Sequence, residues 1–349
     1  MIGVGAAALF SSLFCSTRSR PIAVTDAMVR ISIDKGLACV SRLYDGNAFR
    51  DEYLEYEYPG EAIESPLAGY RLTYRTLDAY FIVLMNRQAG VPDGPAGRLF
   101  ERTDAVTKAL VPVWRRKGIY NLRRRPSPGG IALDTYAILA VLRRDTVMGR
   151  VVEAGLDGDG WLAADFYVGQ EAFRRLADES WAARAVLVAD PEAGVDRLHA
   201  LCRQVIEALR SEHIPVARAN LVIHALEALA DLPPSAAAAT GSQPPSFEES
   251  LRSLRREGVR LLQTSEIRND PLTLANLVGA LVPRRDEEEA TRTMVETLSP
   301  LIDGLIRRQE GDGCWSASSR PGDPSGRVFA TLRVILTLGR YRTFGSERR

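Results

Sequence analysis

The stretch RRQEGDGCWSAS, residues 307–318, can be interpreted in two incompatible ways. Asp312 and Cys314, next to Trp315, carry an oxygen and a sulfur of the kind that bind metal ions. Gln309, Gly313 and Trp315 instead suit the end of one structural repeat and the start of the next. The pattern of apolar residues along the rest of the chain separates the two interpretations.

Six short, almost wholly apolar segments recur along the chain and predict buried helices. They cover residues 75–86, 130–144, 178–190, 217–231, 270–283 and 327–340. The first two share the phrase Leu-Asp-[Ala/Thr]-Tyr-x-Ile, at 77–82 and 133–138, which indicates an internal repeat. A helix that is apolar on every side must be surrounded by protein, so we expect these segments to form an inner layer.

Amphipathic segments separate the apolar ones and predict an outer layer of helices. They cover residues 25–44, 102–118, 195–212, 247–263 and 286–309, with a shorter one near 145–153. Alternation of the two kinds predicts an all-α fold, an (α/α)6 toroid or barrel of six inner and six outer helices. Nothing in the sequence indicates a sheet or a second domain. We therefore expect one domain over residues 25–345, with a low-complexity loop at 233–246.

Composition narrows the functional classes. With 45 basic and 44 acidic side chains among 349 residues, the chain shows neither a nucleic-acid footprint nor a polybasic membrane surface. Its four cysteines are scattered, which argues against a disulfide framework or a zinc knuckle. Residues 1–24 form an N-terminal segment that is either disordered or, if residues 1–17 act as a signal peptide, removed. We expect a soluble, cytoplasmic protein without an integral membrane span; the alternative is a secreted or periplasmic one.

The pattern Gln309, Gly313 and Trp315, between an amphipathic and an apolar helix, resembles the QW repeat of squalene cyclases. This repeat belongs to the wider terpene cyclase and protein prenyltransferase superfamily. The resemblance implies that Gln309 and Trp315 tie an outer helix to the start of the next inner one. It also implies an apolar, isoprenoid-like ligand in a central cavity. The complete motif occurs once, and DGDGW at 157–161 is a partial copy without the Gln.

The catalytic motifs of that superfamily are missing. Class II cyclases protonate an alkene with an Asp-x-Asp-Asp motif and class I synthases use an Asp-rich magnesium motif, yet this chain contains no Asp-Asp dipeptide. Asp312 and Cys314 match the Asp-x-Cys zinc pair of protein prenyltransferases, which also need a later histidine. The three histidines, His199, His213 and His224, all lie upstream. We therefore expect a divergent member with no metal and no cofactor.

Three acidic residues are candidate catalytic groups because they occupy matching places near the starts of the first three inner helices. They are Asp78, Asp134 and Glu179. Carboxylates at one mouth of the ring could act as general acid and base. The alternative is that they only compensate the helix dipoles.

Aromatic residues near these carboxylates are candidate ligand contacts. The stretch 52–61 is rich in tyrosine and glutamate, and further tyrosines follow near the start of the first inner helix. We expect Tyr56, Tyr74, Tyr80, Tyr136 and His224 to contact a ligand. Such residues equally suit a solvated loop, and a lone histidine on an apolar helix equally suits a core position.

Three functions remain compatible with the sequence. The first is a cyclase- or transferase-like protein that binds an isoprenoid. The second is a carbohydrate hydrolase or lyase, since such enzymes also use rings of helix pairs with acidic residues. The third is a non-catalytic binding protein. The lining of the ring should distinguish them: apolar and aromatic for the first, opposed carboxylates with tyrosines for the second.

Overall fold

The computed structural model describes most of the chain as helices. The described residues are 24–44, 62–63, 72–92, 94, 97–121, 130–156, 161–162, 172–232, 246–283, 288–317 and 326–346. Most of the expected loop at 233–246, the residues DGDG of 157–161, and Tyr56 lie outside this part of the chain. No helix within it is long and apolar enough to span a bilayer.

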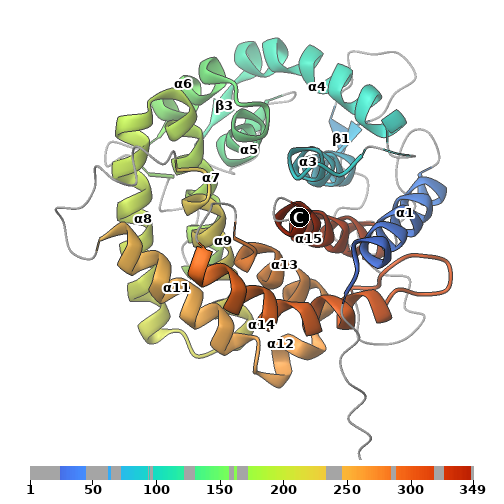
Figure 1. The fold of residues 1–349 in the computed structure, drawn as a ribbon. Helices are drawn as coiled ribbons and strands as arrows, with labels where there is room; N and C mark the ends of the chain where they lie inside the picture. The colour runs from blue at the N-terminus through green and yellow to red at the C-terminus, as the bar shows by residue number, and fades with distance from the viewer. Residues whose placement is uncertain are drawn as a thin grey trace, which may run out of the picture.

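Twelve helices alternate between an outer and an inner ring (Figure 1). The outer ring consists of α1 (Asp26–Leu43), α4 (Gly97–Lys117), α6 (Thr146–Gly155), α8 (Pro191–Ser211), α11 (Phe247–Leu261) and α14 (Glu288–Arg307). The inner ring consists of α3 (Tyr74–Gln88), α5 (Leu133–Arg143), α7 (Ala172–Ala189), α9 (Pro215–Leu229), α13 (Pro271–Leu281) and α15 (Arg327–Ser346). A short helix, α12 (Ser265–Asn269), connects α11 to α13. This arrangement confirms the predicted (α/α)6 toroid.

Four two-residue strands accompany the helices, although the sequence did not indicate a sheet. β1 (Ala62–Ile63) pairs antiparallel with β2 (Leu72–Thr73), which leads into α3. β3 (Ile119–Tyr120) pairs parallel with β4 (Ile131–Ala132), which leads into α5. Strands this short have no periodicity that a sequence pattern can reveal.

Side-chain caps explain where several helices begin. Thr25 accepts a hydrogen bond from the backbone N–H of Met28 at the start of α1. Asp190 and Asp270 cap α8 and α13, and each is followed by a proline in the first turn. These side chains satisfy backbone N–H groups that have no partner inside the helix, so the chain enters each helix at a defined residue.

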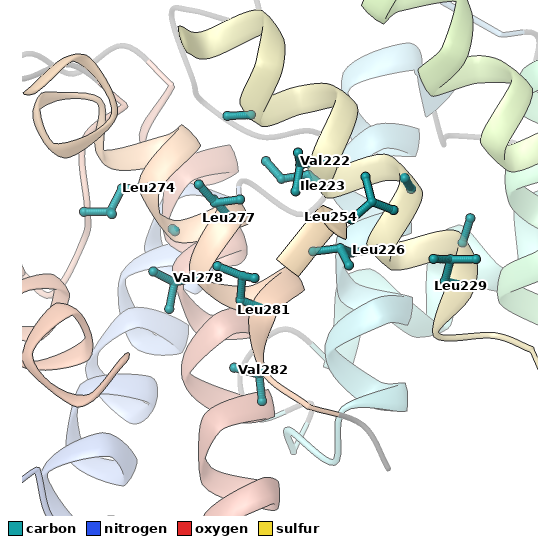
Figure 2. Packing of buried hydrophobic residues seen from close by; sticks show 14 of the residues in the cluster. Val222, Ile223, Leu226, Leu229, Leu254, Leu274, Leu277, Val278, Leu281 and Val282 are labelled. Atoms are coloured by element: carbon teal, nitrogen blue, oxygen red, sulfur yellow. The ribbon is translucent and has the colours of Figure 1, made fainter. Parts of the chain in front are cut away.

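The largest core cluster fills the space between the two rings and between neighbouring inner helices. Figure 2 shows residues of α9, such as Val222 and Leu226, packed beside Leu254 of α11 and Leu277 and Leu281 of α13. A side chain at Gly194 of α8 would overlap the backbone of α7, because its Cβ would lie 2.2 Å from Cα of Leu187. The outer and inner helices therefore pack with their backbones in near contact.

The ring closes where the last repeat meets the first, and α15 packs against both α1 and α3. The Gln309 side chain donates hydrogen bonds to the carbonyl oxygens of Ser32 in α1 and of Gly313, each at 2.8 Å. The Trp315 indole N–H donates to the carbonyl of Leu305 in α14 at 2.7 Å. Its backbone N–H donates to Thr331 in α15 at 2.9 Å. The segment 309–315 thus joins three helices.

A disulfide between Cys39 of α1 and Cys314 adds a covalent link at the same place, with a Cα–Cα distance of 5.5 Å. The scattered cysteines argued against a disulfide framework, and their spacing did not indicate this single bond. The two residues are 275 positions apart in the sequence and meet only because the ring closes. Cys202 of α8 is a buried free thiol.

Candidate functional site

Charged side chains of non-adjacent inner helices interact inside the ring. Arg340 of α15 forms a bidentate ion pair with Glu227 of α9, and one of its two contacts measures 3.0 Å. Helix α13 separates α9 from α15 around the ring (Figure 1), and Arg340 also donates to the carbonyl of Gly279 in α13 at 3.4 Å. Because these two helices are not neighbours, their side chains can meet only if both point toward the centre of the ring.

A second ion pair lies beside the first. The Nε of Arg184, in α7, donates to a carboxylate oxygen of Asp231 at 2.6 Å, just after the end of α9. The Arg184 guanidinium also lies 4.0 Å from the centre of the Trp181 ring, a cation–π contact. The buried cation is thus held by a carboxylate and an aromatic face.

The charges of Arg184 and Glu227, one from each ion pair, act on His224 of α9. Burial, together with the positive charges of Arg333 and Arg184, lowers the pKa of His224 to about 4, and the negative charge of Glu227 opposes this shift. The imidazole is therefore neutral near pH 7 and can donate one hydrogen bond and accept another. We call His224, Arg184, Glu227, Arg333, Arg340 and Asp78 the interior cluster.

Arg333 of α15 is the arginine of this cluster that forms no ion pair with a described residue. Its Nε is buried without a hydrogen-bond partner, and its Nη1 lies 3.9 Å from Sδ of Met85 in α3. The guanidinium lies 5.2 Å from the Phe329 ring. Burial lowers the pKa of Arg333, whereas the charges of Glu227 and Asp78 raise it. Asp78 of α3 therefore belongs to the same electrostatic group.

The other two acidic candidates have different surroundings. Asp134 is buried in the first turn of α5, where Thr135 donates to its Oδ1 at 3.5 Å. Glu179 of α7 is only 1% exposed and accepts from the backbone N–H of Leu162 at 3.4 Å. Asp78 is the acidic candidate that interacts with Arg333.

The tyrosine candidates face the outer ring. The Tyr80 hydroxyl donates to Asp104 of α4 at 2.8 Å and accepts from Arg143 at 3.3 Å. The Tyr136 hydroxyl accepts from Arg115 of α4 at 3.1 Å. Both phenol groups therefore lie between the two layers of helices, and burial raises the pKa of each. The Tyr74 side chain lies outside the described part of the structure.

The contacts of Asp312 and Cys314 test whether the segment 307–318 forms a metal site. Ligand atoms of Asp312, Cys314 and Cys39 lie within 4.8 Å of one another, so α1 supplies the third potential ligand that no histidine provides. The two sulfurs are bonded to each other, however, and the Asp312 carboxylate pairs with Arg327 at 2.5 Å. A disulfide has no thiolate to offer a zinc ion. This arrangement does not fit a zinc site.

Sequence analysis missed Arg184, Glu227, Arg333 and Arg340. Three of them stand alone within apolar runs: AARAVLVA at 182–189, HALEALA at 224–230 and LRVILTL at 332–338. A charged residue inside a helix that is otherwise buried is uncommon unless it is paired or functional. That interruption of the apolar pattern was the signal that could have identified them.

Comparisons with known proteins identify the fold of this chain but not its activity. No protein-family model and no curated protein matches this chain. Among solved structures, the apo form of the type II terpene cyclase MstE from Scytonema is similar, with a TM-score of 0.52 and 16% sequence identity. The match covers 92% of this chain and all of that one. The chain therefore has the α/α toroid fold of a terpene cyclase.

Proposed function

We propose that this toroid binds an isoprenoid-like ligand inside its inner ring and acts on it as a divergent terpene cyclase or transferase. The observation that carries the proposal is the fold likeness to a type II terpene cyclase over 92% of the chain. The inward faces of the six inner helices would surround the ligand. Fold alone does not define chemistry, so the residues must supply it.

Asp78 is the best candidate for the acid or base of such a reaction. It is partly exposed near the start of α3 and interacts electrostatically with Arg333 of the neighbouring helix α15. A carboxylate at this position can stabilise positive charge that develops on an apolar substrate. Asp134 is the second candidate, and Glu179 is the weakest because a backbone N–H already holds it.

A carbohydrate hydrolase or lyase receives less support. That function needs two available carboxylates near aromatic platforms. Glu227 is held bidentately by Arg340, and the hydroxyls of Tyr80 and Tyr136 bond to α4. These contacts leave fewer groups free to bind a sugar.

Ligand binding tests the proposal directly. We expect quenching of tryptophan fluorescence to saturate at micromolar geranylgeraniol or squalene, and not with maltohexaose, because the ring interior of the family's fold receives apolar chains. Trp181 in α7, beside the interior cluster, is the natural reporter. Saturable binding of the oligosaccharide without any binding of isoprenoids would overturn the proposal.

Turnover is tested with matched carboxylate variants. After incubation with isoprenoid alcohols, hydrocarbons and diphosphates, products are separated by gas chromatography with mass detection. Asp78→Asn should lower turnover by about 100-fold or more while ligand binding persists, since an amide cannot transfer the proton. Asp134→Asn is compared in parallel, and Asp196→Asn, at an exposed site in α8, is the control. Full activity in Asp78→Asn would exclude that carboxylate from the reaction.

A further inference from the structure

Arg333 has hydrogen-bonding capacity that this protein does not use. A guanidinium offers five N–H donors, yet within the described residues its closest polar contact is the sulfur of Met85 at 3.9 Å. Its Nε is buried and has no partner. Arg184 and Arg340, on the same side of the inner helices, each pair with a carboxylate. Arg333 is therefore the cation of the interior cluster that has no hydrogen-bonded anion.

A buried N–H group without a partner destabilises a folded protein because its lost hydration is not replaced, and the Nε of the half-buried Arg333 is such a group. The two nearest carboxylates act on Arg333 through their fields without bonding to it. Glu227 is already engaged by Arg340, and Asp78 lies on another helix. Such an arrangement suits a residue whose N–H groups donate hydrogen bonds to a bound ligand.

We propose that Arg333 binds the carboxylate of a ligand that is an apolar carboxylic acid. This inference rests on the proposed function and specifies its substrate class. A planar guanidinium donates two parallel hydrogen bonds to one carboxylate, which matches both its shape and its single charge. Arg184 and Arg340 are paired with Asp231 and Glu227, and the charge of Asp78 also acts on Arg333, so the cluster leaves hydrogen-bond donors for one carboxylate and no excess positive charge for a diphosphate.

Apolar groups beside Arg333 would contact the hydrocarbon part of the ligand. The Phe329 ring lies 5.2 Å from the guanidinium, and the Met85 side chain contacts it from α3. Trp181 occupies the corresponding place at Arg184. An aromatic or thioether surface next to a charged head group suits an acid whose hydrocarbon chain begins close to the carboxylate.

The test compares ligands that share one chain and differ in the head group. Calorimetric titrations use farnesoic acid, its methyl ester, farnesol and farnesyl diphosphate. The wild-type protein should bind the acid about 10- to 100-fold more tightly than the ester or the alcohol, as expected for a hydrogen-bonded charge pair. Arg333→Met should bind all of the uncharged ligands as before and lose the preference for the acid. Arg210→Met, at a well-exposed position on α8, should retain it.

The stability of the variant gives a second readout. Arg333→Met removes a buried N–H group that has no partner, so the melting temperature of the variant should equal or exceed that of the wild type. A clear fall in melting temperature would show that Arg333 has a structural partner and would overturn the proposal. The comparison of acid with ester in the wild type needs no variant and remains decisive if Arg333→Met fails to fold.

The outcomes separate this inference from the proposed function. Equal affinity for acid, ester and alcohol would remove the carboxylate site and leave isoprenoid binding intact. Tighter binding of the diphosphate than of the acid would overturn the assignment of a single negative charge. Absence of binding for every ligand with this chain would overturn both proposals.

Discussion

At the scale of single residues, His224 links the interior cluster to pH. Burial lowers the pKa of this side chain to about 4, with Arg333 as the next contribution. Its usual value in an unfolded chain is about 6.5. The unfolded chain therefore binds more protons than the folded one between these two values, so stability is complete above pH 6.5 and is lost as the pH falls toward 4.

We expect His224→Gln to reduce this acid sensitivity. Between pH 7 and pH 4.5 the wild type should lose about 2–3 kcal/mol more of its free energy of unfolding than the variant, from a shift of two to three pKa units. Urea denaturation at the two pH values measures the difference. His213→Gln, at an exposed residue, is the control and should follow the wild type. Identical pH profiles for the wild type and His224→Gln would mean that the imidazole is accessible to protons in the folded protein.

At the scale of secondary-structure elements, the turn after α14 depends on one glycine. Gly313 has a φ of +91°, a conformation that L-amino acids rarely adopt, and an added Cβ would lie 2.6 Å from the carbonyl oxygen of Lys35 in α1. The close approach allows the turn to lie against α1, where Gln309 and Cys314 then make their contacts. Local backbone conformation and ring closure are thus coupled at this position.

Gly313→Ala should lower the free energy of unfolding by about 2–3 kcal/mol, because it adds backbone strain and a steric overlap. Gly311→Ala is a matched control two residues away. A Cβ there would meet nothing within 4 Å, so the change should be close to neutral. Thermal and urea unfolding of the two variants measure the contrast. Equal stability of the two variants would show that α1 and the turn can move apart without lowering the free energy of unfolding.

At the scale of the whole molecule, closure of the ring joins the ends of the described chain. The disulfide between Cys39 and Cys314 closes a loop of 275 residues, and a long loop is where a covalent link most restricts the unfolded chain. The noncovalent contacts of Gln309 and Trp315 lie at the same junction. Covalent and noncovalent links therefore stabilise one interface.

Reduction should lower the free energy of unfolding by about 2–5 kcal/mol. Melting temperatures with and without dithiothreitol measure this effect, and Cys39→Ser should be insensitive to the reductant. In denatured protein that has not been reduced, Cys202 should react with an alkylating reagent while Cys39 and Cys314 do not. Alkylation of Cys39 and Cys314 without a reductant, or stoichiometric zinc that is lost in Cys314→Ala, would contradict the disulfide.

The helical toroid was predictable because the pattern of apolar residues within each segment identifies the layer to which its helix belongs. Apolar residues spaced along segments such as 217–231 and 247–263 distinguish inner from outer helices without reference to any distant residue. Even the short outer helix near 145–153 was expected, and it is present as α6. The capping residue Thr25 likewise acts only on the following turn.

The site depended on long-range contacts that no local pattern contains. Whether a side chain of an inner helix faces the centre or the outer ring is set by the rotation of that helix against its neighbours. The hydroxyls of Tyr80 and Tyr136, for example, form hydrogen bonds with residues of α4, which the sequence did not indicate. Asp78, Glu227 and Arg333 come from three separate repeats and interact only once the ring has formed. Hydrophobic periodicity therefore accounts for the layers of this protein, while the pairing of its buried charges and the Cys39–Cys314 bond arise from packing between residues far apart in the chain.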